Sequence, residues 1–112
     1  LVLDVRVNEC YTNQEIADIV SQAPCEITPR SLRLQSSSID KEHPLVVAGI
    51  AMERNTYGSP TLSDQAALSC PSLKLGPGDS TRSHTADEFI YTDEIKEAVR
   101  LYIELLDQVI TS

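Results

Sequence analysis

A histidine in a polar loop is the residue of this sequence whose type and neighbours most clearly suggest chemistry. His84 lies three residues before Asp87 and four before Glu88, in the loop of residues 76–88. Imidazole is the commonest metal ligand, and nearby acids can hold its second nitrogen. A lone histidine in a polar loop is more often an ordinary surface residue, and a catalytic zinc needs about three protein ligands. By spacing alone, His84 is therefore an incomplete metal site.

The other reactive side chains do not form a motif of a known catalytic type. The serines lack a G-x-S-x-G elbow, and Gly76-Pro77-Gly78 is too short, with no lysine, to be a phosphate-binding loop. Cys10, Cys25 and Cys70 contain no C-x-x-C pair. Their odd number and spacing predict free thiols in a reducing cytoplasm.

Composition excludes two classes of partner. The net charge is −8 over 112 residues, which argues against a protein that binds nucleic acid through clustered lysine and arginine. The longest apolar stretch, residues 45–51, is far shorter than the roughly 20 residues that cross a membrane. We therefore expect no nucleic-acid partner and no membrane partner.

The elements that would position these loops begin with a strand–helix–strand unit. Residues 1–7 alternate apolar and polar side chains, which predicts a half-buried strand. Thr12 and Glu15 form a capping box for a helix that should end near Pro24. Residues 25–36 read as a second strand whose alternation changes phase at Pro29. This is half of a small α/β sandwich, and a chain that opens inside a strand indicates a piece cut from a longer protein.

The second half of the sequence predicts three more helices and a short strand. Pro44 suits the first turn of a helix that runs to about Arg54. Ser63 can cap a short helix over residues 64–68, and residues 71–75 read as a buried strand. Thr92 caps a long terminal helix, whose predicted apolar stripe is Ile95, Val99, Tyr102, Leu106 and Val109.

Three segments in this order resemble the C-terminal part of the di-zinc aminoacylase and deacetylase family, which includes acetylornithine deacetylase and succinyl-diaminopimelate desuccinylase. They are the hydroxyl-rich loop of residues 58–64, the strand ending in Gly76-Pro77-Gly78, and Ser83-His84-Thr85-Ala86-Asp87-Glu88. The family pattern is a T-S-D loop, a strand ending in G-P-G, then H-T-x-D-E and a long helix. The resemblance implies an α/β fold. Residues 1–40 would be the second half of a small α/β lid, or dimerisation, domain, and residues 41–112 the C-terminal part of a zinc-peptidase-like catalytic domain.

The resemblance also implies roles for individual residues. His84 would ligate one of two zinc ions, and Arg6 would grip the substrate carboxylate. A solvent-facing arginine on a polar strand face is the alternative for Arg6. Thr61, Ser63 and Gly78 would lie along the substrate, although Leu62 departs from the family's usual threonine or glycine.

The family's H-x-D motif, bridging aspartate and paired glutamates are absent from this sequence. No catalytic residue is therefore expected within the chain, and the chain alone should be inactive. One hypothesis is a C-terminal piece of a cytoplasmic, dimeric zinc hydrolase of amino-acid biosynthesis, which removes the acyl group from an N-acyl amino acid such as N-acetylornithine. The alternative is a non-catalytic interaction module that associates through strand edges.

Overall fold

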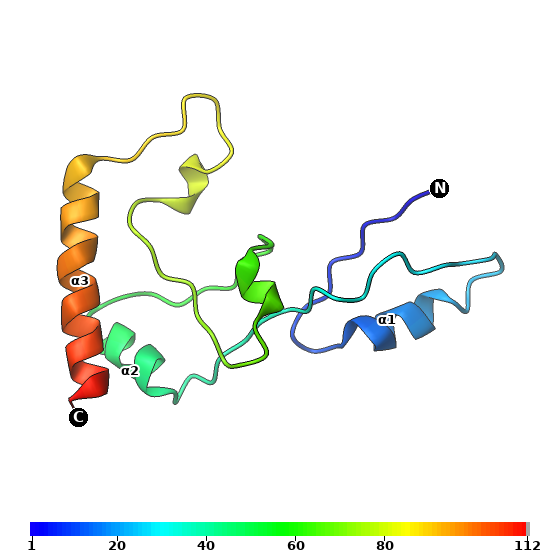
Figure 1. Ribbon diagram of the computed structural model, residues 1–112, viewed down its shortest axis with the longest axis horizontal. Coiled ribbons are helices and arrows are strands. Elements are labelled where there is room, and N and C mark those ends of the chain that lie inside the picture. Colours follow the sequence, from blue (N-terminus) through cyan, green and yellow to red (C-terminus); the bar gives the residue numbers. More distant parts are fainter. Residues whose placement is uncertain (112) are drawn as a thin grey trace. The chain divides into compact units, whose positions relative to one another are not determined.

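Three α-helices and two short 3-10 helices make up the regular structure of the chain in a computed structural model, which describes residues 1–111 (Figure 1). Residue 112, the last of the second predicted domain, lies outside the described residues. The α-helices are α1 (Asn13–Val20), α2 (Pro44–Ala51) and α3 (Thr92–Ile110), and the 3-10 helices are η1 (Asp64–Ala67) and η2 (Ser80–Arg82). Residues 1–111 contain no β-strand.

The expected α/β fold is therefore wrong, both for the lid piece and for the catalytic piece. A strand exists only where its backbone pairs with a neighbour, and alternation of side chains does not supply that neighbour. Leu1 and Leu3, which the alternation placed on a buried face, are fully and two-thirds exposed. In residues 25–36, the carbonyls of Leu32 and Leu34 accept hydrogen bonds from the side-chain amide of Asn13 instead of from a second strand.

The chain divides into two units, the first of which comprises Leu1–Ile39 and Gly58–Leu73. Its helix α1 begins with the predicted capping box: the Thr12 hydroxyl accepts from the Glu15 N–H at 3.2 Å, and the Thr12 N–H donates to the Glu15 carboxylate at 2.7 Å. The Ser72 N–H donates to the Ser38 carbonyl. Ala66 is the one buried apolar residue of this unit among the described residues.

The second unit comprises Asp40–Tyr57 and the chain from Lys74 onward. Helix α2 begins at Pro44, as predicted, and the His43 ring accepts from the Leu45 N–H. Helix α2 is followed by Met52 and the left-handed Glu53 (φ 59°), and the Arg54 N–H returns to the Gly49 carbonyl in a Schellman turn. Helix α2 packs against α3 (Figure 1), and together they bury Val46, Ala48, Ala98 and Leu105.

Helix α3 does not present its predicted stripe to a core. Tyr102 and Val109 are half-buried, and the Tyr102 hydroxyl donates to the Leu75 carbonyl at 2.5 Å. Ile95, Val99 and Leu106, which were predicted on the same face, are exposed. The helix therefore carries one packed apolar face and a second, adjacent apolar face that faces solvent.

Little of the apolar surface is removed from water. Among residues 1–111 the buried apolar side chains are Val46, Ala48, Ala66, Ala98 and Leu105. Large apolar side chains are exposed in both units, among them Leu1, Tyr57, Leu68 and Ile110. No helix within residues 1–111 is long and apolar enough to cross a membrane.

Candidate functional site

The loop between η2 and α3, which contains His84, is fastened by an arginine–glutamate pair. Arg82 donates two parallel hydrogen bonds to the Glu94 carboxylate, at 2.7 and 2.9 Å. The Arg82 guanidinium also lies over the rings of Phe89 and Tyr91, at 4.8 and 5.2 Å from their centroids. The rings meet edge to face at 5.3 Å. Bidentate and cation–π contacts of this kind fix the loop to the first turn of α3.

The same contacts shift the pKa values of Arg82 and Glu94. Hydrogen bonds from Arg82 and from the Tyr91 N–H stabilise the Glu94 carboxylate and lower its pKa from the ordinary value of 4.5. The hydrogen bonds to Glu94 raise the pKa of Arg82. At the start of η2, the Asp79 carboxylate accepts from the Thr81 N–H and hydroxyl, which lowers the pKa of Asp79. Ionised carboxylates thus stabilise the start of η2, through Asp79, and the contact of the loop with α3, through Glu94.

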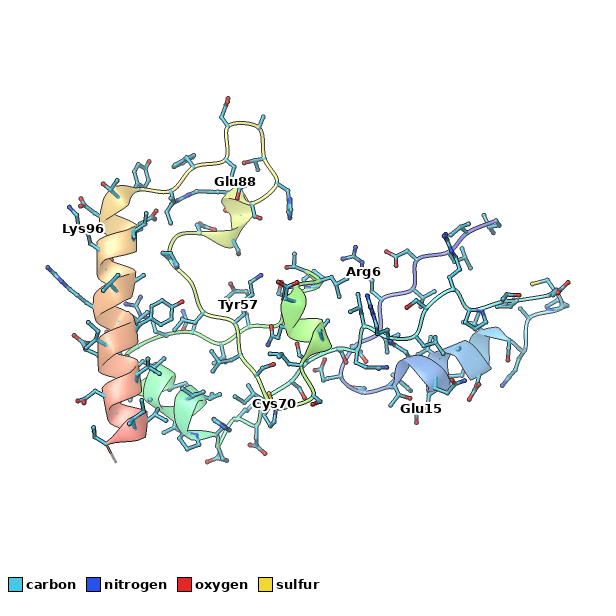
Figure 2. All side chains as sticks on the ribbon, viewed as in Figure 1. Arg6, Glu15, Tyr57, Cys70, Glu88 and Lys96 are labelled. Carbon is cyan, nitrogen blue, oxygen red and sulfur yellow. The ribbon has the colours of Figure 1, made fainter. Side chains whose placement is uncertain are left out.

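His84 is exposed on this loop, in a left-handed backbone conformation (φ 60°). Its N–H donates to the Glu88 carboxylate at 3.1 Å, so this acid holds the backbone of His84 and not its ring. Glu88 is labelled in Figure 2, in the loop that precedes α3. No group of three or more histidine, cysteine, aspartate or glutamate side chains in residues 1–111 could hold a metal ion. His84 with its neighbours does not fit a complete zinc site.

Gly78, two residues before η2, has a backbone conformation that favours glycine. Its φ is +80°, and a Cβ added there would approach the Ile90 side chain to 3.3 Å. An L-residue would be strained at this φ and crowded by Ile90. The glycine therefore allows the turn that leads into η2.

Arg6 lies in the first unit, beside the hydroxyl-rich loop (Figure 2). Its Nη1 donates to the Pro60 carbonyl at 3.1 Å, and its Nε donates to the Asp4 carboxylate at 3.4 Å. The hydroxyls of Ser59 and Thr61 share a hydrogen bond on either side of Pro60. A contact across 54 sequence positions thus brings the predicted carboxylate-binding arginine to the predicted hydroxyl loop.

Arg6 keeps the capacity to bind an anion. Its side chain is 63% exposed, and an arginine has five N–H donors, of which the two described contacts use two. The planar guanidinium can therefore still engage a carboxylate. Ser63 follows on the same loop, half-buried at the start of η1, where its carbonyl accepts from the Ala66 N–H. Arg6, Thr61 and Ser63 belong to the first unit, and Gly78 and His84 belong to the second.

Two features were not predicted from the sequence. The first is the Arg82–Glu94 pair, which joins residues 12 positions apart across an irregular loop. The second is an open hollow between the end of α2 and the middle of α3, lined largely by charged side chains: Glu53, Arg54, Glu97, Arg100 and Glu104. Arg54 and Glu97 form an exposed ion pair there at 3.5 Å. Opposite charges within the hollow partly neutralise one another, so it favours no ligand class.

The three cysteines are exposed and form no disulfide in the described chain. No family model matches the sequence, and none of the curated proteins searched matches it.

Proposed function

We propose that the chain is part of a zinc-dependent amidohydrolase that removes the acyl group from an N-acyl amino acid, in the manner of acetylornithine deacetylase. Two features support the proposal. In the sequence, the hydroxyl-rich loop, Gly76-Pro77-Gly78 and Ser83–Glu88 follow one another in the family's order. In the structure, the Arg6 contact to Pro60 sets an exposed guanidinium beside Thr61, and this is the observation that carries the proposal.

The roles proposed for this chain are binding and orientation. In the first unit, Arg6 would hold the α-carboxylate of the substrate beside the hydroxyls of Thr61 and Ser63. Gly78, in the second unit, would have the substrate-binding role that the resemblance implies. His84 would supply one zinc ligand, its ring being exposed while its N–H is held by Glu88. The remaining ligands and the general base would come from residues outside this sequence, so no step of the reaction is assigned to the chain alone. The proposed protein is cytoplasmic and dimerises through residues 1–40.

Hydrolysis of N-acetylornithine tests this function. The 112-residue chain alone should show no zinc-dependent hydrolysis, whereas the complete product of its reading frame should be active and should encode H-x-D and paired glutamates upstream. In that product, His84→Ala should lower kcat by at least about a hundredfold, because a lost ligand weakens the metal site. His43→Ala is the matched control and should leave kcat unchanged. A complete product without those upstream motifs, or an unaffected His84→Ala variant, would overturn the proposal.

A non-catalytic interaction module is the second candidate. The observation that favours it is the exposed apolar surface, which includes Leu1 and Leu3 in the first unit and Ile103 and Ile110 in the second. Surfaces of this kind mark protein interaction sites. A complete product that lacks hydrolase activity but forms a defined oligomer would favour this function.

A further inference from the structure

The exposed apolar face of α3 is used neither by the fold nor by the proposed activity. Its side chains are between 44% and 76% exposed, and they are Ile95, Val99, Ile103, Leu106 and Ile110. At about 100° and 1.5 Å per residue, they fall within an arc of about 80° along about 22 Å of helix. We call these five residues the α3 stripe. Such a stripe is the face that an amphipathic helix normally buries.

Charged residues follow one edge of the α3 stripe in a definite order. Lys96 and Arg100 lie at this edge in the N-terminal half of the helix, and Asp107 lies at the same edge in the C-terminal half. Among the described residues, Lys96 pairs with the exposed Asp93 at 3.4 Å, and no ion pair engages Arg100 or Asp107. The edge therefore carries two bases and one acid, of which Lys96 alone forms an ion pair among the described residues.

We propose that the α3 stripe is a homodimer interface in which the α3 helices of two copies pack antiparallel. A two-fold axis between Tyr102 and Ile103 sets Ile95 opposite Ile110 of the second copy, and Val99 opposite Leu106. In this register Asp107 lies level with Ala98 of the second copy, within about 3 Å along the axis of both Lys96 and Arg100. Equivalent edges meet in an antiparallel pair. The attraction between Asp107 of one copy and Lys96 and Arg100 of the other therefore forms twice, once on each side of the two-fold axis.

Charge decides both the orientation and the partner. In a parallel pair opposite edges of the two helices meet, so Lys96, Arg100 and Asp107 would face the uncharged edge of the second copy and would gain no opposite charge. An anionic membrane surface fits poorly, because α3 carries five acidic and two basic residues. A second copy in the antiparallel orientation supplies both the apolar cover and the opposite charges. This assembly does not depend on the proposed activity, and it differs from dimerisation through residues 1–40.

The first test is sedimentation equilibrium of the 112-residue chain at micromolar concentrations. The wild type should dimerise, and Ile103→Asp should weaken the dimer at least about 30-fold, as expected for a central apolar contact. Val47→Asp, which puts the same charge at an exposed valine of α2, is the control and should dimerise like the wild type. Circular dichroism checks that both variants keep their helices. A monomeric wild type, or an Ile103→Asp variant that dimerises normally, would overturn the proposal.

Charge reversal tests the register. Asp107→Lys should weaken the dimer about tenfold, and so should the double variant Lys96→Glu/Arg100→Glu. Combining all three changes restores opposite charges and should return the dissociation constant to within about threefold of the wild type. Glu104→Lys makes a comparable change of charge about 140° away from the centre of the α3 stripe and should have little effect. Failure of the triple variant to recover would refute the antiparallel register. A dimer lost with Leu3→Asp but kept with Ile103→Asp would refute the α3 interface and place the contact in residues 1–7.

Discussion

Arg6 and Arg82 both lie beside a loop that the sequence marks as a candidate site, but their surroundings differ. The Arg6 side chain is 63% exposed, with one long contact to Asp4 and one to the Pro60 carbonyl. The Arg82 side chain is 22% exposed, forms two short hydrogen bonds to Glu94 and lies over two aromatic rings. Arg82 therefore holds its loop in place, whereas Arg6 retains donors for a ligand.

The two units that contain these arginines also differ in how many apolar side chains they bury. Arg82 belongs to the unit in which α2 and α3 bury Val46, Ala48, Ala98 and Leu105. Arg6 belongs to the unit in which Ala66 alone is buried among the described residues. We infer that the α2–α3 unit unfolds cooperatively and that the other unit opens at little cost in free energy.

Removing the core of the α2–α3 unit should have the largest effect. Leu105 is 5% exposed, so Leu105→Ala leaves a cavity and should lower the free energy of unfolding by about 2–5 kcal/mol. Leu3→Ala, at a residue that is 66% exposed in the other unit, should change it by less than about 0.5 kcal/mol. Urea unfolding followed by circular dichroism measures both. Equal losses in the two variants would show that the units do not differ in packing.

A smaller effect is expected at the turn before η2. Gly78→Ala puts a Cβ on a left-handed backbone, close to Ile90, and should lower the free energy of unfolding by about 1–2 kcal/mol. Gly58, whose Cβ would meet nothing within 4 Å, is the control. Gly58→Ala should be neutral or slightly stabilising. The same urea experiment decides, and a neutral Gly78→Ala would mean that the turn does not constrain the loop.

The Arg82–Glu94 pair should appear in the pH dependence of stability. The pKa of Glu94 is lowered in the folded chain, so its carboxylate stays ionised at a pH where the same side chain is protonated in the unfolded chain. The stabilisation is present above the ordinary value of 4.5 and is lost as the pH falls through the folded pKa. Glu94→Gln should therefore reduce the slope of stability against pH at pH values below the ordinary pKa of 4.5. Asp79 and Glu15 should maintain part of the slope, because the pKa of each is also lowered.

Urea midpoints at several pH values measure this slope. Glu104→Gln, which makes the matched change at an exposed glutamate of the same helix outside the pair, is the control. An unchanged slope for Glu94→Gln would mean that the pair does not form in solution.

Local signals in the sequence predicted the helices because their causes are local. The Thr12–Glu15 capping box lies within one helical turn, and the preference of Pro44 for the first turn of α2 does not depend on residues distant in sequence. The start of α3 was predicted within one residue, since Tyr91 and not Thr92 is its N-cap. These elements need only neighbours in sequence.

The absence of the expected strands and the contacts that hold the His84 loop could not be predicted in this way, because both depend on residues distant in sequence. Alternation in residues 1–7 indicates a preference for a half-buried strand, but the structure supplies no second strand for it. The Asn13 side chain instead bonds to the carbonyls of Leu32 and Leu34, a contact that no local pattern signals. Likewise, Arg82 and Glu94 meet only because the intervening loop turns back on α3.

The contrast between the two arginines can be measured at their own side chains. In a ¹⁵N-labelled chain, the Nε–Hε resonances of Arg6 and Arg82 can be followed while N-acetylornithine is added, with N-acetylornithinamide, which lacks the carboxylate, as the matched ligand. We expect N-acetylornithine to shift the Arg6 resonance in a saturable manner, the amide to shift neither resonance, and Arg82 to stay fixed throughout. Arg6→Gln should abolish the response while changing stability by less than about 0.5 kcal/mol. A saturable shift of Arg82, or an Arg6 resonance that does not respond to the carboxylate, would contradict the division between a binding and a structural arginine.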